Sequence, residues 1–420
     1  VGLRYLVIQV ISGLLLMMGT IIHYHATGSI AFDHLGLATP GGWLIFVAFG
    51  IKAAFPLLHN WVQDAYPEAT VSGTVILSIY TTKLAIYSLA RGYAGTEALI
   101  TIGAVMTIFP IFFAVIENDL RRVLAYSLNN QLGFMVVGIG IGTPLALNGA
   151  AAHAFAHILY KGLLFMSMGA VLHRVGTIKA SELGGLYKSM PWTAAFCIVG
   201  SMSISAFPLF SGFVTKSMIL TAAAENHHWI AWLALLVASA GVLDHSGIKV
   251  PFFSFFHHDA GFRVREAPLN MLLAMGATAA LCIGIGVYPA PLYAILPFDV
   301  EYSPYTSTHV INQLQLLMFA ALAFVVLFRS GLYPPEVRGL NLDSDWLYRR
   351  LLPAIGRGIR DSVAALRARI VAGLGQLAGL AGHWLTDAFG TNGAAARTWT
   401  TGVMLLWVTA LLAAYLLLYY

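Results

Sequence analysis

Long apolar stretches separated by short polar turns make up most of this chain. Apolar runs of about 20 residues recur along its length, and a helix that long crosses a hydrocarbon core of about 30 Å. The pattern therefore predicts an all-α, polytopic transmembrane helix bundle with about 11 spans. We expect the spans near residues 5–24, 42–57, 70–90, 97–115, 123–142, 148–172, 191–222, 229–249, 268–297, 309–328 and 398–419.

Two of the predicted spans contain the same interruption. The sequence Ala-Phe-Pro-Leu occurs at residues 54–57 and again at residues 206–209. A proline inside a helix removes one hydrogen bond and clashes with the carbonyl four residues earlier, so we expect breaks at Pro56 and Pro208. Broken helices at corresponding places in two halves are typical of transporters built from inverted repeats. Kinks of purely structural origin are the alternative.

Basic residues concentrate in alternate loops, which indicates the orientation. Loops rich in Lys and Arg lie on the cytoplasmic side of a membrane. The loops near residues 25–41, 143–147, 223–228 and 299–307 contain neither residue, and Arg91 is the exception to the alternation. We therefore place in the cytoplasm the loops that carry Arg121, Arg122, Arg174, Lys179, Lys188, Arg263, Arg265 and Arg329.

Residues 331–396 differ from the rest of the chain. Arginines recur there among Leu, Ile, Val and Ala in a mostly helical rhythm. This pattern predicts a cytoplasmic amphipathic helix on the anionic inner leaflet, between a membrane domain at 1–330 and a last span within 397–420. A solvated linker helix without a lipid role is the alternative.

Composition excludes a soluble globular protein. The 420 residues are 59% hydrophobic and 10% charged, and the mean hydropathy is +0.78. Basic loops explain the net charge of +5, so we expect the lipid bilayer and not nucleic acid as a partner. Cys197 and Cys282 lie far apart in apolar runs and offer no disulfide, zinc or iron–sulfur framework. We expect no cofactor, and any redox chemistry would belong to a partner.

Ionisable residues nevertheless occur within the predicted spans. His153, His157 and Lys161 follow one another at intervals of four, which places them on one helix face. Further lysines in apolar surroundings are Lys52, Lys83 and Lys216. A lysine at the centre of a membrane helix costs about 2.5–3.5 kcal/mol, which favours a functional role. For Lys216 and Lys249, which lie near predicted span ends, the alternative is a side chain that reaches the interface.

Lysine and histidine in apolar surroundings suit proton transfer, because burial can bring their titration near neutral pH. His153 and His157 could relay protons toward Lys161 through intervening water. Two histidines at this spacing could instead bind a metal, but a lysine one turn away would repel it. We therefore expect no metal site.

Acidic partners are fewer. Glu117, Asp119 and Asp244, with His245 beside the last of these, are candidates for proton uptake or charge pairing. The alternative for Glu117 and Asp119 is helix capping and pairing with the arginines that follow them.

Four stretches resemble a known family, the antiporter-like subunits shared by Mrp sodium/proton antiporters and respiratory complex I. They are residues 52–65 (KAAFPLLHNWVQDA), 117–127 (ENDLRRVLAYS), 153–164 (HAFAHILYKGLL) and 207–216 (FPLFSGFVTK), and the resemblance covers about residues 1–330. The sequences at 129–133 (NNQLG) and 67–70 (PEAT), together with Lys83, resemble the D-type subunits of Mrp antiporters in particular.

The resemblance implies two inverted five-helix repeats, each with a broken helix. It also implies that Lys52 and Lys83 belong to one proton half-channel, Lys161 to the central axis and Lys216 to a second half-channel. The family pairs the lysine that resembles Lys52 with a glutamate on an earlier helix. This chain starts after that helix, so we expect an N-terminally truncated fragment, about five spans short, in which Lys52 lacks its partner.

These observations predict a proton-conducting subunit of a hetero-oligomeric cation (Na⁺)/proton antiporter in a bacterial inner membrane, without covalent catalysis of its own. The alternative is a proton-pumping subunit of an NADH:quinone oxidoreductase or a membrane-bound hydrogenase. A proton-coupled partner of an inorganic-carbon transporter is a third possibility.

Overall fold

The computed structural model describes residues 1–339, 341 and 343–419, which contain helices and no β-strand. The prediction of an all-α polytopic membrane protein is confirmed. The chain divides into two compact units, residues 1–345 and 346–420, which are described separately.

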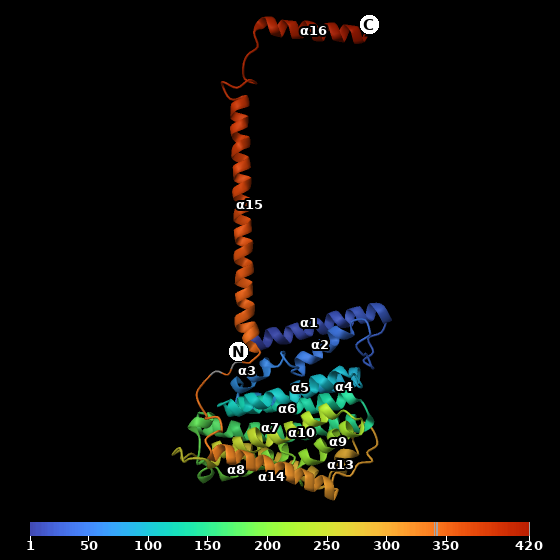
Figure 1. The fold of residues 1–420 in the computed structure, drawn as a ribbon, viewed down its shortest axis with the longest axis vertical. Coiled ribbons are helices and arrows are strands. Elements are labelled where there is room, and N and C mark those ends of the chain that lie inside the picture. The colour runs from blue at the N-terminus through green and yellow to red at the C-terminus, as the bar shows by residue number, and fades with distance from the viewer. Residues whose placement is uncertain (340, 342, 420) are drawn as a thin grey trace. The chain divides into compact units, whose positions relative to one another are not determined.

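The first unit is a bundle whose long helices run roughly parallel, with α1 at one edge and α14 at the other (Figure 1). Its α-helices are α1 (Gly2–Thr27), α2 (Gly42–Lys52), α3 (Asn60–Glu68), α4 (Val71–Tyr93), α5 (Ala98–Ile116), α6 (Leu120–Ile141), α7 (Pro144–Val175), α8 (Pro191–Ile204), α9 (Ser211–Glu225), α10 (Trp229–Val242), α11 (Lys249–Pro251), α12 (Leu269–Val287), α13 (Ala290–Tyr293) and α14 (Ser307–Arg329). The short 3₁₀ helices η1 (Ala180–Glu182) and η2 (Leu186–Lys188) follow α7, and the π-helical turns η3 (Leu243–Ile248) and η4 (Phe252–Phe256) flank α11.

Within the described residues, nine helices are long and apolar enough to cross a membrane. Eight of these nine coincide with predicted spans, and the ninth, Leu347–Phe389, was predicted as an interfacial segment. The predicted span at 229–249 is too short, because the helix continues through η3, α11 and η4 to Phe256.

Both predicted breaks are present and have the same backbone conformation. α2 ends at Lys52 and α3 begins at Asn60, while α8 ends at Ile204 and α9 begins at Ser211. In each Ala-Phe-Pro-Leu segment the alanine and the leucine have positive φ, 62° and 69° in the first and 58° and 73° in the second. L-residues rarely adopt this left-handed conformation, so two identical instances indicate the same local fold. The inverted relation between the two halves stays a prediction.

α7 lies at the centre of the bundle. It packs against α4, α6, α8, α9 and α12, and 72% of an apolar 18-residue stretch of it is buried inside the molecule. A membrane helix enclosed by other helices can carry polar side chains that lipid would not tolerate.

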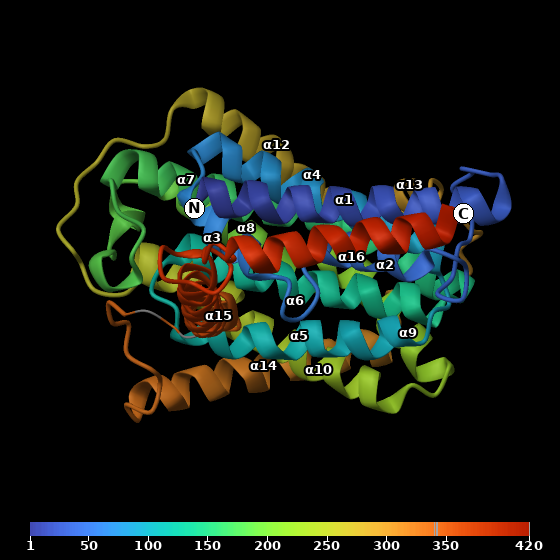
Figure 2. The ribbon, with the colours of Figure 1, turned by 90° about the horizontal axis from the view of Figure 1, so that it is seen from above.

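The basic loops gather at one end of the bundle. Figures 1 and 2 show the loop after α7 and the loop of residues 257–268 at one end, opposite α13 and the end of α1. The alternation of basic and non-basic loops along the chain requires that the basic loops lie together at one end. We call this end of the bundle the basic end.

The second unit contains η5 (Leu347–Leu351), the 38-residue helix α15 (Leu352–Phe389) and α16 (Thr401–Tyr419). Charged and apolar side chains of α15 are both exposed within this unit. The helical character of residues 352–389 was expected, whereas their position on the inner leaflet stays a prediction.

Candidate functional site

The three ionisable side chains of α7 are all enclosed by protein. His153, His157 and Lys161 each have an exposed fraction of 0%. The ring of His153 lies between two hydroxyl groups, with its Nδ1 3.1 Å from Thr215 Oγ1 on α9 and its Nε2 3.2 Å from Tyr160 OH. The Tyr160 hydroxyl also donates to Gln131 Oε1 on α6 at 3.1 Å. A row of polar groups therefore crosses the centre of the bundle from α9 to α6.

Lys161 Nζ and both ring nitrogens of His157 are buried and have no hydrogen-bond partner among the described residues. Structural polar groups in protein interiors are normally hydrogen-bonded, because leaving one unpaired costs about 1–3 kcal/mol or more. Ionisable groups that are buried without a fixed partner are typical of functional sites.

Lys216 does not reach the membrane interface. Its side chain is 1% exposed, and its Nζ donates a 2.6 Å hydrogen bond to the carbonyl oxygen of Ile204 across the second break. The ammonium also lies 5.1 Å from the ring centre of Phe134 on α6. Since α8 ends at Ile204, the lysine faces the negative end of that helix dipole.

Lys83 is buried on α4, which packs against α7. Its Nζ donates to the carbonyl oxygen of Ser78 and lies 3.3 Å from Thr82 Oγ1. All of its hydrogen-bond partners in the described chain belong to its own helix, so no acidic group holds it.

Lys52 is the last residue of α2, at the edge of the first break, and is half-buried. It has a hydrogen-bond partner that was not expected, because its Nζ donates to Gln9 Oε1 on α1. That partner is an uncharged amide, in contrast to the glutamate that the family resemblance implies.

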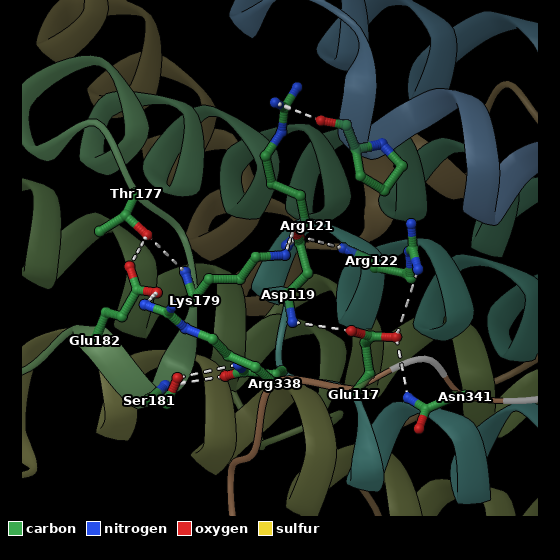
Figure 3. A network of polar contacts seen from close by, with 12 residues as sticks. Glu117, Asp119, Arg121, Arg122, Thr177, Lys179, Ser181, Glu182, Arg338 and Asn341 are labelled. Carbon is green, nitrogen blue, oxygen red and sulfur yellow. Dashed lines mark hydrogen bonds and ion pairs between the residues drawn. The ribbon is translucent and has the colours of Figure 1, made fainter. Parts of the chain in front are cut away.

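Glu117 and Asp119 occupy a polar network at the basic end of the bundle (Figure 3). Asp119 caps α6, since its carboxylate accepts from the backbone N–H groups of Arg121 and Arg122, and it pairs with Lys179 at 2.8 Å. Glu117 lies 3.9 Å from Arg122 and accepts a 3.1 Å bond from Asn341. The capping role considered for Asp119 is therefore present.

Asp244 and His245 lie on the π-helical turn η3. The His245 ring is fully buried, with Nδ1 2.9 Å from Ser246 Oγ and Nε2 without a hydrogen-bond partner in the described chain. Asp244 Oδ1 is also buried and accepts no hydrogen bond there. Because π-helical turns often occur at functional sites, this segment joins the candidate site.

Lys249 was expected near a span end, where its side chain could reach the interface, and this interpretation is wrong. Its side chain is 0% exposed and forms an ion pair with Glu336 at 2.8 Å. Its Nζ also donates to the carbonyl oxygens of Val115 and Glu117 at 2.6 Å and 2.8 Å. The aromatic run at residues 252–256 continues the helix beyond Lys249. In the sequence, this run was the signal that Lys249 lies within the span and not near its end.

The connector, residues 331–345, was not predicted to contribute to the site. Besides Glu336, it supplies Asp343, whose Oδ2 lies 3.1 Å from His59 Nε2 and accepts a 2.9 Å bond from Tyr126. Burial acts to raise the pKa of Asp343, but the His59 contact and the other hydrogen bonds hold it below the ordinary value. His59 is the last residue before α3, so the connector places a carboxylate at the end of the first break.

The arrangement suits stepwise proton transfer. Buried bases occur from Lys83 through α7 to Lys216, with hydroxyl and imidazole groups between them. Among the described residues, no group of three His, Cys, Asp or Glu side chains is placed to hold a metal ion.

Residues 1–241 match the family described as NADH:quinone oxidoreductase/Mrp antiporter, transmembrane. The chain is 28% identical to hydrogenase-4 component B of Escherichia coli (strain K12) over 68% of this chain and 49% of that protein. It is also 28% identical to the D-type subunit of the Na⁺/H⁺ antiporter of Alkalihalophilus pseudofirmus over 70% of this chain and 63% of the relative. The chain thus spans about half to two thirds of the length of these curated relatives.

A solved structure of similar fold is the membrane-bound sulfane sulfur reductase, an archaeal respiratory membrane complex. One of its chains is 23% identical, with a TM-score of 0.64, over 97% of this chain and 76% of that chain. At this identity the likeness concerns the fold alone.

Proposed function

Since this chain belongs to the NADH:quinone oxidoreductase/Mrp antiporter family of transmembrane proteins, we propose that it conducts protons as one subunit of a multi-subunit cation/proton antiporter. The observation that carries the proposal is the set of three enclosed ionisable groups on α7, His153, His157 and Lys161, between Lys83 and Lys216. No lipid reaches these groups, and Lys161 has no fixed partner in the described chain. A group in that position is free to exchange a proton in either direction.

Sodium as the exchanged cation is supported by the resemblance to the D-type subunits of Mrp antiporters and by the Na⁺/H⁺ antiporter relative from Alkalihalophilus pseudofirmus. The chain would perform no covalent catalysis and would reside in a bacterial cell membrane with other subunits. The buried lysines and histidines on and beside α7 supply the proton path. We assign no sodium path to this chain.

A second candidate is a proton-translocating subunit of a redox complex, and the hydrogenase component among the relatives favours it. In that case electron transfer in partner proteins drives the same row of groups. The two candidates differ in what starts proton movement, a sodium gradient or an electron donor.

The test uses the complete protein in its native complex, in sealed membrane vesicles with a fluorescent pH probe. Lys161→Ala and Lys52→Ala are expected to reduce proton movement to the background of vesicles without the complex, while assembly persists. Lys188→Ala is the matched control, because that lysine ends η2 at the basic end and forms an ion pair only with Asp259 among the described residues. Wild-type rates in the Lys161→Ala variant would falsify the proposal.

The same vesicles separate the two candidates. Added sodium without an electron donor moves protons in an antiporter, and a redox complex responds only when the donor is present. Identification of the subunits that copurify with the chain gives an independent answer.

A further inference from the structure

A small cavity opens at the basic end of the bundle, away from the α7 groups. Its volume is about 310 Å³, and it lies between η1, the end of η4, α14 and the connector. Ser181, His257, His258 and Glu336 provide its polar lining, and Phe253 and Phe328 are among its apolar walls. The volume is sufficient for several water molecules, each of which occupies about 30 Å³ in the liquid.

Glu336 connects this cavity to the interior. Its side chain is only 7% exposed and lines the cavity, while its Oε1 is paired with Lys249, whose side chain is 0% exposed. Its Oε2 is buried and accepts no hydrogen bond from the described residues. A buried ion pair contributes little to stability, because desolvation of both ions offsets their attraction. The pair therefore calls for a role other than holding the fold together.

The groups that face Glu336 come from several elements. Lys249 on α11 lowers its pKa, and Glu117 before α6 and Asp244 on η3 raise it. Burial has the largest effect, and the net result is a pKa above the ordinary value for glutamate. His257, His258 and Tyr333 are the other titratable groups around the cavity.

Beyond Lys249, the π-helical turn η3 packs against α6 and α8, both of which contact α7. The backbone N–H of Lys249 is bonded to the carbonyl oxygen of Asp244, one turn earlier. Next to Asp244 is the enclosed His245, whose Nδ1 lies 2.9 Å from Ser246 Oγ. Ser246 Oγ donates at 2.7 Å to Ser127 Oγ on α6. Polar and ionisable groups thus follow one another from the cavity to α6, which packs against α7.

We propose that this cavity is a proton uptake site on the cytoplasmic side, in which Glu336 takes protons from water and Lys249 passes them inward. The proposal rests on the proton-conducting function proposed above and extends it to two residues outside the α7 row. It gives the connector a direct part in transport.

The proton balance closes over one cycle. A hydronium ion in the cavity gives its proton to the Glu336 carboxylate, which leaves neutral glutamic acid beside the Lys249 ammonium. Lys249 then releases a proton inward to the Asp244 carboxylate and becomes a neutral amine. Transfer of the proton from Glu336 to Lys249 restores the original ion pair, and Asp244 passes its proton on toward His245.

Access to the cavity can be tested without measuring transport. His258→Cys places a thiol on the cavity wall, and Ser303→Cys places one on an exposed loop at the opposite end. The native Cys197 and Cys282 are both buried, so their background reaction with a charged, membrane-impermeant thiol reagent is low. In vesicles with the cytoplasmic face outward we expect labelling of His258→Cys and none of Ser303→Cys. Labelling of His258→Cys only from the other face, or only in detergent, overturns the assignment.

The role of the ion pair is tested in the assembled complex. Glu336→Gln is expected to slow proton movement about tenfold or more, the loss typical when a positioned proton carrier is removed. The loss should be greatest at alkaline pH, where hydronium is scarce, and a small weak acid such as azide should restore part of the rate. The matched control is Glu301→Gln, an exposed glutamate at the opposite end, which should transport like the wild type.

Glu336→Gln leaves the buried Lys249 ammonium without its counter-ion, so the double variant Glu336→Gln/Lys249→Gln carries the test if the single variant does not assemble. Wild-type transport by either assembled variant overturns the proposal, as does a loss that neither pH nor azide changes. The test of the uptake site can fail while the test of the proton-conducting function succeeds. If Lys161→Ala abolishes transport and Glu336→Gln does not, only the uptake site is wrong.

Discussion

The Lys216 ammonium lies 2.6 Å from the carbonyl oxygen of Ile204, so a charge on α9 is held by the free end of α8 across the second break. The broken backbone and the lysine thus form one unit. The break supplies carbonyl oxygens that an intact helix would use for its own hydrogen bonds. A lysine held by a carbonyl dipole, without a carboxylate, can lose its proton without leaving an unpaired negative charge.

We predict that Lys216→Met and Lys216→Arg both abolish proton transport. Methionine removes the charge, whereas arginine retains the charge but does not release a proton near neutral pH. The measurement is proton movement in vesicles, with assembly checked by copurification of partner proteins. Full transport by the arginine variant would show that Lys216 acts only as a fixed charge.

The second break is also held by close contact with α12. A Cβ added at Gly286 would lie 2.2 Å from the carbonyl oxygen of Leu209, whereas one added at Gly284 meets nothing within 4 Å. Gly286→Ala should therefore destabilise the protein by about 1–3 kcal/mol through overpacking. Gly284→Ala, on the same helix, should be neutral or slightly stabilising. Thermal unfolding in detergent compares the two, and equal melting temperatures would contradict this account of the break.

For the histidines of α7 we predict graded slowing instead of complete loss. His153 is hydrogen-bonded to Thr215 and Tyr160, whereas His157 has no hydrogen-bond partner in the described chain. We expect that water can carry a proton past either histidine when only that one is removed. His153→Ala and His157→Ala should each slow transport, and the double variant should also change its pH profile. An unchanged profile in the double variant would count against a relay.

Glu182 gives a prediction about stability and pH at the basic end. Hydrogen bonds from Thr177 and Arg338, both 2.6 Å long, hold the pKa of Glu182 below its ordinary value. Its stabilising effect is therefore present above the unfolded pKa of about 4.3 and is lost as pH falls through the lower folded value. The effect should stay below about 1 kcal/mol, because the Glu182–Arg338 pair is largely exposed.

The comparison of wild type with Glu182→Gln checks this sign. The melting temperature of the wild type should exceed that of the variant at pH 7, and the difference should shrink below about pH 4.3. A difference that grows on acidification would mean that the folded protein favours the protonated form of Glu182.

The breaks and the buried α7 groups could be predicted from the sequence because their signals are local. A proline within an apolar run indicates a break wherever the rest of the chain lies, and spacing by four places His153, His157 and Lys161 on one face. The left-handed conformation of Ala54 and Ala206 could not be predicted, since neither residue favours positive φ by itself.

The partners of the lysines depend on contacts between distant segments. Gln9 reaches Lys52 from 43 positions away, and Asp343 reaches His59 from 284 positions away. No periodicity in either segment indicates such a pairing. The connector in particular reads as a polar turn after the last bundle helix, and only the folded structure brings Glu336 to Lys249.

The connector has a consequence for how this protein can be shortened or recombined. A chain cut after Arg329 would retain every helix of the bundle, yet Lys249 would lose Glu336 and His59 would lose Asp343. The first loss leaves the buried Lys249 ammonium without its counter-ion, and the second removes the carboxylate that contacts the buried His59 ring. Chimeras that exchange C-terminal tails between relatives should therefore join after residue 345, so that the bundle keeps both carboxylates.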